Sequence, residues 1–220
     1  MKCIQIDNLL TPSYLQRLYN LTAGMNGFPW FFLSEDVSYS TNDVMFGDMP
    51  MMDMPDEQKT VGFTHVLLEK GDNIASPFLP TFEPLLDSIK DAMPGPIEFT
   101  RVRLALQLNN GKSHYNAPHT DSEEDHYAAI FYLHDSSGDT VFFDQYDDPN
   151  SGTVQERWYK ATTNTEWTEH KRVTPEANKL FVFDGHQFHA SSNPTQHKFR
   201  VILNLNFYSD HDLFGAANSQ

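Results

Sequence analysis

The chain has 220 residues, of which 39% are hydrophobic and 13% aromatic, so its composition indicates one folded domain and not a disordered chain. Its 15 basic and 30 acidic residues give a formal net charge of −15, which argues against a nucleic-acid partner and against attraction to anionic membranes. The single cysteine, Cys3, excludes an intramolecular disulfide and a thiolate zinc site.

The first residues lack the apolar region of a signal peptide, and no apolar run approaches the ~20 residues of a membrane span, so we expect a cytoplasmic protein.

Two helices are predicted in the amino-terminal part of the chain. Thr11 and Pro12 are typical of a helix N-cap and first turn, and they predict a helix to about Asn20. A second helix is predicted from near Phe82 to just before Pro94, with apolar residues at helical spacing on its buried face.

The segment 34–60 is rich in methionine and aspartate and contains two prolines, Pro50 and Pro55, that discourage regular structure. One interpretation is a surface loop whose methionines fill gaps, and we favour it. The other interpretation is a mobile lid whose soft side chains close over a substrate.

Residues 99–208 have the pattern of short strands separated by turns. Phe99–Leu108 alternates polar and apolar residues with a period of two, which predicts a strand with one apolar face. Further strands are predicted at Tyr127–Leu133, Thr140–Phe143, Leu180–Phe183 and Phe199–Phe207. We therefore expect a mostly β fold with flanking helices, an antiparallel sandwich or jelly roll, in a single domain of residues 1–220. Residues 1–98 supply the helices and residues 99–208 the β core.

Three residues have the types and spacing of a metal site. His119 and Asp121 are two residues apart, so on an extended segment both side chains point the same way. His189 follows an apolar strand and the turn Asp184-Gly185, and it is the best candidate for a third ligand; its rival is His186. Two imidazoles and one carboxylate form the facial triad of non-haem Fe(II) oxygenases, which leaves positions for a 2-oxo acid and O2. Taken singly, each residue is better explained as a turn, cap or core residue, and the ordered set described below favours the metal site.

Arg200 is predicted to place a positive charge inside the β core. It shares its parity along the strand 199–207 with Ile202, Asn204 and Asn206, whereas the alternate positions are apolar. A buried guanidinium needs an anionic partner, and the far carboxylate of 2-oxoglutarate would meet that need. The alternative is an ion pair with an aspartate of this acidic chain.

Several motifs, in order, resemble a known family. They are His119-x-Asp121, Ala129–Leu133, Gly138–Phe143, Leu180–Gly185 with His189, and Arg200. Residues 101–207, about half of the chain, thereby resemble the Fe(II)/2-oxoglutarate-dependent oxygenase superfamily, in its prolyl-4-hydroxylase-like branch.

This resemblance implies a double-stranded β-helix with Fe(II) as cofactor and with 2-oxoglutarate and O2 as co-substrates. It implies that Arg200, helped by Tyr132, holds the C5 carboxylate of 2-oxoglutarate. The alternative for Tyr132 is a core aromatic whose hydroxyl has another partner. Gln107 and Asn109, from the strand before the triad, are candidates to face the same pocket.

The resemblance also implies a reaction. With Asp121 present, where halogenating members have a small residue, the expected reaction is hydroxylation of an aliphatic C–H bond. Asn206 stands where nucleotide-repair members have a second arginine, which again argues against nucleic acid. The expected substrate is a peptidyl residue such as proline, an amino acid or a small metabolite.

Two other functions stay open from the sequence. One is a cupin-like metal enzyme that does not use 2-oxoglutarate, and the other is a non-catalytic jelly-roll binding module. The insertion 144–178, with Trp158, Tyr159 and Trp167, is predicted to be either part of a substrate wall or a surface hairpin. Six other histidines in polar surroundings are predicted to be solvated: His114, His126, His134, His170, His186 and His197.

Overall fold

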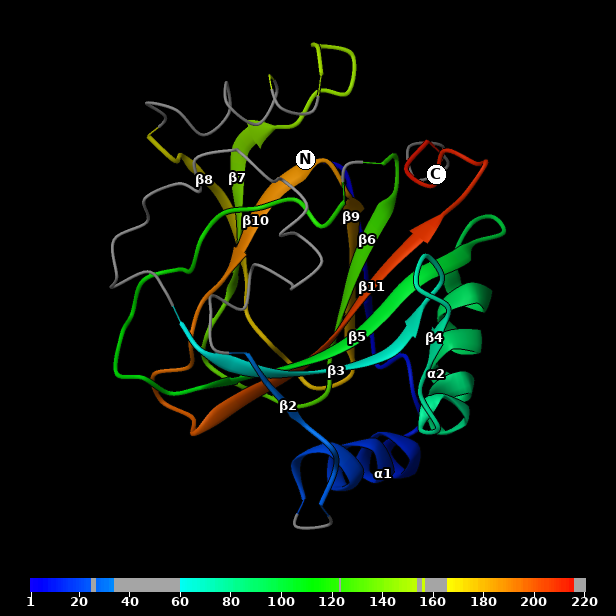
Figure 1. Cartoon of the computed structure of the whole chain (residues 1–220), viewed down its shortest axis with the longest axis vertical. Coiled ribbons are helices and arrows are strands. Elements are labelled where there is room, and N and C mark those ends of the chain that lie inside the picture. The colour runs from blue at the N-terminus through cyan, green and yellow to red at the C-terminus, as the bar shows by residue number, and fades with distance from the viewer. Residues whose placement is uncertain (25–26, 34–59, 123, 154–155, 157–165, 216–220) are drawn as a thin grey trace.

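The computed structural model describes residues 1–24, 27–33, 60–122, 124–153, 156 and 166–215 (Figure 1). The helices are α1 (Pro12–Ala23) and α2 (Leu79–Ala92). The strands are β1 (Cys3–Asp7), β2 (Phe31–Leu33), β3 (Gly62–Glu69), β4 (Ile74–Ala75), β5 (Glu98–Leu108), β6 (Tyr127–Tyr132), β7 (Thr140–Tyr146), β8 (Glu169–Val173), β9 (Lys179–Asp184), β10 (Gln187–Ser191) and β11 (Phe199–Tyr208). Neither described helix is long and apolar enough to cross a membrane.

Two antiparallel sheets form the body of the protein. The larger sheet has the order β1-β9-β6-β11-β5-β3-β2, with β4 paired to β3, and the smaller sheet has the order β10-β7-β8. Figure 1 shows α1 and α2 beside the larger sheet, on the side away from the smaller one. The non-sequential strand order and the two facing sheets are those of a jelly roll, as the sequence predicts.

Alternate side chains of β11 face two different buried regions, one against the helices and one between the two sheets. Val201, Leu203 and Leu205 point to the helices, where they pack in one core with Leu18 of α1 and Leu85 of α2. The opposite parity points between the two sheets and carries Arg200, Ile202, Asn204 and Asn206, all buried. The predicted inward arginine is thus confirmed, and the space between the sheets is where the polar side chains gather.

Several elements differ from the prediction. Helix α1 continues to Ala23, and α2 begins at Leu79 with Pro84 in its second turn. Strands β1, β2, β3, β4, β8 and β10 were not predicted, because they are short or carry no clear alternation of apolar and polar residues. The segment 34–60, interpreted from the sequence as a loop or a lid, lies outside the described residues except for Thr60.

Truncation of Leu203 is expected to destabilise the protein strongly. Its side chain is fully buried between β11 and the helices, so Leu203→Ala should lower the free energy of unfolding by about 2–5 kcal/mol. Leu108→Ala, at a side chain 42% exposed on the neighbouring strand, is the control and should change it by less than ~0.5 kcal/mol. Urea unfolding monitored by circular dichroism measures both. Similar losses in the two variants would contradict the assigned core.

Candidate active site

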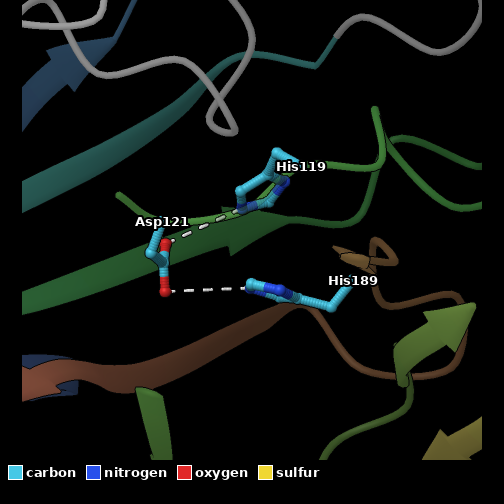
Figure 2. A group of neighbouring side chains, drawn as sticks. All are labelled: His119, Asp121 and His189. Atoms are coloured by element: carbon cyan, nitrogen blue, oxygen red, sulfur yellow. Dashed lines mark ion pairs between the residues drawn. The ribbon is translucent and has the colours of Figure 1, made fainter. Parts of the chain in front are cut away.

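His119, Asp121 and His189 converge between the two sheets (Figure 2). Each offers one ligand atom, and these atoms all lie within 4.8 Å of one another. The His119 Nε2 atom is 3.9 Å from Asp121 Oδ1, and the His189 Nε2 atom is 3.8 Å from Asp121 Oδ2. All three residues are shielded from solvent, so the structure brings together the three residues that the sequence singles out.

The backbone fixes the two histidines relative to each other. His189 lies on β10, and His119 lies in the connection between β5 and β6, where it forms an isolated antiparallel bridge with His189. The His119 N–H donates to the His189 carbonyl at 2.9 Å, and the His189 N–H donates back at 3.0 Å. Two ligands far apart in the sequence are therefore held at one place by a pair of main-chain hydrogen bonds.

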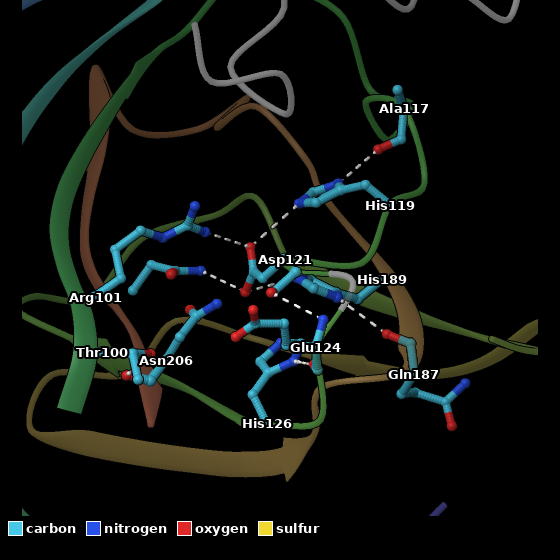
Figure 3. Close-up of polar contacts among 12 residues, drawn as sticks. Thr100, Arg101, Ala117, His119, Asp121, Glu124, His126, Gln187, His189 and Asn206 are labelled. Atoms are coloured by element: carbon cyan, nitrogen blue, oxygen red, sulfur yellow. Dashed lines mark hydrogen bonds and ion pairs between the residues drawn. The ribbon is translucent and has the colours of Figure 1, made fainter. Parts of the chain in front are cut away.

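Both imidazole rings are oriented by their Nδ1 atoms. His119 Nδ1 lies 3.0 Å from the Ala117 carbonyl, and His189 Nδ1 lies 3.1 Å from the Gln187 carbonyl (Figure 3). A carbonyl can only accept, so Nδ1 carries the proton and the Nε2 lone pair faces Asp121. Burial lowers the pKa of His189 to about 4, and the neighbouring His119 adds to this effect. His189 is therefore neutral near pH 7, as a metal ligand must be.

Asp121 is ionised and receives a hydrogen bond on each oxygen. Arg101 Nη2 donates to Oδ1 at 3.1 Å, and Asn204 Nδ2 donates to Oδ2 at 3.1 Å. Burial alone would raise the pKa of Asp121, but the guanidinium groups of Arg101 and Arg103 help to hold it well below its usual range. Two neutral imidazoles and one carboxylate are a donor set that suits Fe(II) and leaves coordination positions open.

Arg200 lies on the same inner face as this group and is only 1% exposed. Its Nη1 donates to Gln107 Oε1 at 2.7 Å, and its Nη2 donates to Thr140 Oγ1 at 2.6 Å. The Tyr132 hydroxyl shares a hydrogen bond of 2.8 Å with the same Thr140 oxygen. Both acceptors of the guanidinium are thus neutral oxygens.

No described carboxylate forms an ion pair with Arg200. The negative charge of Asp139 acts to raise the pKa of Arg200, but the Asp139 carboxylate pairs with Arg172, at 3.9 Å. The alternative explanation for Arg200, an ion pair with an aspartate, is therefore not found among the described residues. A buried guanidinium without a counter-ion is costly, so the surroundings of Arg200 favour the binding of an anion.

Two further candidates differ in their location. Gln107 is 4% exposed, accepts a hydrogen bond from Arg200, and donates from Nε2 to Ser191 Oγ at 2.5 Å, so it faces the same interior as Arg200. Asn109 does not belong to this group, and its predicted location was wrong. Strand β5 ends at Leu108, and the exposed Asn109 amide donates to the carbonyls of Thr195 and His197 instead.

Thr140 and Arg101 were not singled out from the sequence. Thr140 begins a predicted strand on the same parity as the buried Phe142, a signal that could have placed it inside. The strand pattern likewise places Arg101 on the inner face, but its contact with Asp121 depends on the path of the connection after β5. Trp167 of the insertion packs on Phe143 and Phe188 at ring-centroid distances of 5.2 Å, whereas Trp158 and Tyr159 lie outside the described residues.

His186 has a separate environment. It is 4% exposed, so the prediction that it is solvated was wrong. Its Nε2 lies 2.9 Å from Asp125 Oδ1 and its Nδ1 lies 3.6 Å from Asp147 Oδ2. The carboxylate of Asp147 makes the largest contribution and raises the pKa of His186, the Asp125 carboxylate adds to it, and burial only partly offsets them. Both ring nitrogens thus face carboxylates outside the triad.

Replacing His186 with asparagine is expected to destabilise the protein in a pH-dependent way. Because the pKa of His186 is raised above 6.5 on folding, its ion pairs contribute fully below that pH and are lost as the pH rises through the folded-state value. His186→Asn should therefore cost about 1.5–3 kcal/mol of unfolding free energy in mild acid and less in mild alkali. Denaturant titrations of both proteins across this range measure the effect. A cost that grows with pH would contradict the assigned ion pairs.

Comparisons with known proteins show the fold. No protein-family model matches the chain, and no curated protein matches it either. Among solved structures, the chain is similar to the non-haem α-ketoglutarate-dependent epimerase SnoN from nogalamycin biosynthesis, with a TM-score of 0.56, 10% identity, and coverage of 94% of this chain and 78% of SnoN. The chain is also similar to the non-haem α-ketoglutarate-dependent carbocyclase SnoK from the same biosynthesis, with a TM-score of 0.56, 9% identity, and coverage of 94% of this chain and 79% of SnoK.

A third similar structure is AviO1 from Streptomyces viridochromogenes Tue57, with a TM-score of 0.54, 14% identity, and coverage of 95% of this chain and 90% of AviO1. At these identities the similarity shows a common fold. The chain therefore has the jelly-roll fold of non-haem, α-ketoglutarate (2-oxoglutarate)-dependent enzymes, on which its own residues build the site described above.

Proposed function

We propose that this protein is an Fe(II)- and 2-oxoglutarate-dependent oxygenase that hydroxylates an aliphatic C–H bond. The observation that carries the proposal is the pairing of two features in one interior. One is a buried His119-Asp121-His189 donor set, and the other is the buried guanidinium of Arg200, which has no carboxylate partner among the described residues. The first suits Fe(II), and the second suits the far end of a dicarboxylic acid.

The spacing along β11 supports the assignment of 2-oxoglutarate. Asn204, which contacts Asp121, and Arg200 are on the same face and four residues apart, about 13 Å along the strand. Both side chains face the space between the two sheets, where we propose that one small diacid reaches from the metal centre to the guanidinium. Thr140 and Tyr132 would complete the carboxylate site, since both hydroxyls lie beside the arginine.

In this proposal the protein binds the metal and 2-oxoglutarate, orients them, and excludes water. His119, Asp121 and His189 would hold the metal, and Arg200 would hold the C5 carboxylate of 2-oxoglutarate. When bound, iron and 2-oxoglutarate supply the oxidation: O2 gives one oxygen atom to succinate, formed with loss of CO2, and the other to the substrate C–H bond. The enclosing sheets keep this chemistry away from bulk solvent.

Anaerobic spectroscopy tests the proposal without knowledge of the substrate. The protein with Fe(II) should develop a visible metal-to-ligand charge-transfer band when 2-oxoglutarate is added, and admission of O2 should then yield succinate. A metal-loaded protein that gives neither signal would support the cupin-like alternative, and failure to bind metal would support a non-catalytic binding module.

Epimerisation or ring closure is a second candidate outcome, because SnoN and SnoK share this fold. Neither outcome requires that an oxygen atom remain in the product. Incubation under ¹⁸O2 separates them from hydroxylation, which incorporates the label into the product. For the substrate itself, we propose a small molecule or a peptidyl residue and not a nucleic acid, with support from the net charge of −15.

A further inference from the structure

Three arginines lie on the inner face of the two central strands of this acidic protein. Arg200 is at one end of the pocket, opposite Gln107. Arg101 and Arg103 are at the other end, opposite Asn206 and Asn204, beside the triad. The 2-oxoglutarate site accounts for Arg200 only. The two arginines of β5 therefore form a second positively charged region, close to where the reacting C–H bond must lie.

Arg101 uses only one of its terminal nitrogens within the described structure. Its Nη2 donates to Asp121 Oδ1 at 3.1 Å. Its Nη1 makes no hydrogen bond to any described residue, and Figure 3 shows this nitrogen pointing away from Asp121. The side chain keeps 13% of its surface exposed, so the free end of the guanidinium is accessible.

The charge of Arg101 needs a second anion once the metal site is filled. A divalent ion on the triad takes up the charge of Asp121, which is the carboxylate that pairs with Arg101 in the structure. Arg103, 8% exposed and next on the same face, adds another positive charge beside the same carboxylate. A largely buried guanidinium beside a dication and a second arginine attracts a negatively charged ligand strongly.

We propose that the substrate carries a carboxylate and that Nη1 of Arg101 binds it. This inference rests on the proposed oxygenase function and names the class of substrate that the same site takes. Because Arg101 contacts Asp121 with its other nitrogen, a carboxylate on Nη1 places the neighbouring carbon atoms beside the metal. Arg101 is thus a specificity-determining residue, and an uncharged amide of the same shape is a poor ligand, since it brings no charge to the site.

Matched pairs of small molecules test this inference. The probes are isovalerate, phenylacetate, N-acetyl-L-leucine and N-acetyl-L-proline, each compared with its primary amide. They are added to the anaerobic Fe(II) protein saturated with 2-oxoglutarate, so that Arg200 is already occupied. Binding is followed by the change in the charge-transfer band and by the shift in melting temperature. We expect at least one acid to bind at least ~10-fold more tightly than its amide, a factor that corresponds to about 1.4 kcal/mol.

Variants connect this preference to Arg101. Arg101→Met is expected to remove the difference between acid and amide, and Arg101→Lys, which keeps the charge, to retain part of it. The control is Arg172→Met, which removes a surface arginine paired with Glu169 and should keep the full preference. If Arg101→Met binds no iron, the wild-type acid and amide pairs still decide.

Each other result would overturn the inference: no acid binds the wild type, amides bind as well as acids, or Arg101→Met binds iron and keeps the preference. Failure of the proposed function is seen separately, because the charge-transfer band would then be absent before any probe is added.

Discussion

Arg200→Met is expected to weaken 2-oxoglutarate binding by at least ~10-fold to 100-fold, because charge-assisted hydrogen bonds contribute roughly 1.5–3 kcal/mol each. Methionine keeps much of the side-chain volume but removes the positive charge and all donors. Iron binding should be retained, since Arg200 contacts Gln107 and Thr140 and none of the three proposed ligands. Anaerobic titration of the Fe(II) protein with 2-oxoglutarate, followed by its charge-transfer band, gives the affinity.

The matched control for this prediction is again Arg172→Met. Arg172 is an arginine of the small sheet whose guanidinium pairs with Glu169 at the surface, so its loss should leave 2-oxoglutarate affinity unchanged. Equal affinity in wild type and Arg200→Met would make Arg200 a structural residue. The assignment of 2-oxoglutarate would then lose its main support.

Removal of any one triad side chain is expected to abolish Fe(II) binding, whereas removal of His186 is not. His189→Ala leaves two protein ligands, and Asp121→Ala removes the only anionic one and leaves Arg101 without its partner. In His186→Asn, by contrast, the triad is intact, because both ring nitrogens of His186 face Asp125 and Asp147. Anaerobic Fe(II) titration against a chelator of known affinity measures all three variants.

This comparison separates loss of a ligand from loss of stability. His186→Asn should be less stable than wild type and still bind iron, whereas His189→Ala should fold and bind none. Iron retained by His189→Ala and lost by His186→Asn would show that the third ligand had been assigned to the wrong histidine. Melting temperatures recorded on the metal-free proteins check that each variant is folded.

The residues that the sequence identifies well are those whose position depends on one strand or one short motif. Arg200 is inward because β11 alternates over its whole length, and His119 and Asp121 share a side because they are two residues apart. His189 was found from its place after an apolar strand and a turn, although β10 itself was not predicted. Local periodicity placed these side chains, whereas the choice of His189 over His186 depended on the resemblance to the oxygenase family.

The features that were missed depend on contacts between segments. Thr140 reaches Arg200 from the opposite sheet, and no spacing in either strand specifies that distance. Asn109 was misplaced because one residue beyond the end of β5 the alternation no longer applies. The polar neighbours of His186 in the sequence predict a solvated side chain, because they conceal how closely Asp125 and Asp147 enclose it.

The bridge between His119 and His189 also protects an edge of the smaller sheet. Strand β10 is the outermost strand of that sheet, and the chain around residues 115–119 runs along it, with bridges at Tyr115–Ser192 and His119–His189. An uncovered strand edge exposes hydrogen-bonding groups that can pair with another chain and start aggregation. A metal ion that holds His119 against His189 would keep this cover closed. Removal of a bound metal ion is then expected to expose this strand edge and to increase aggregation.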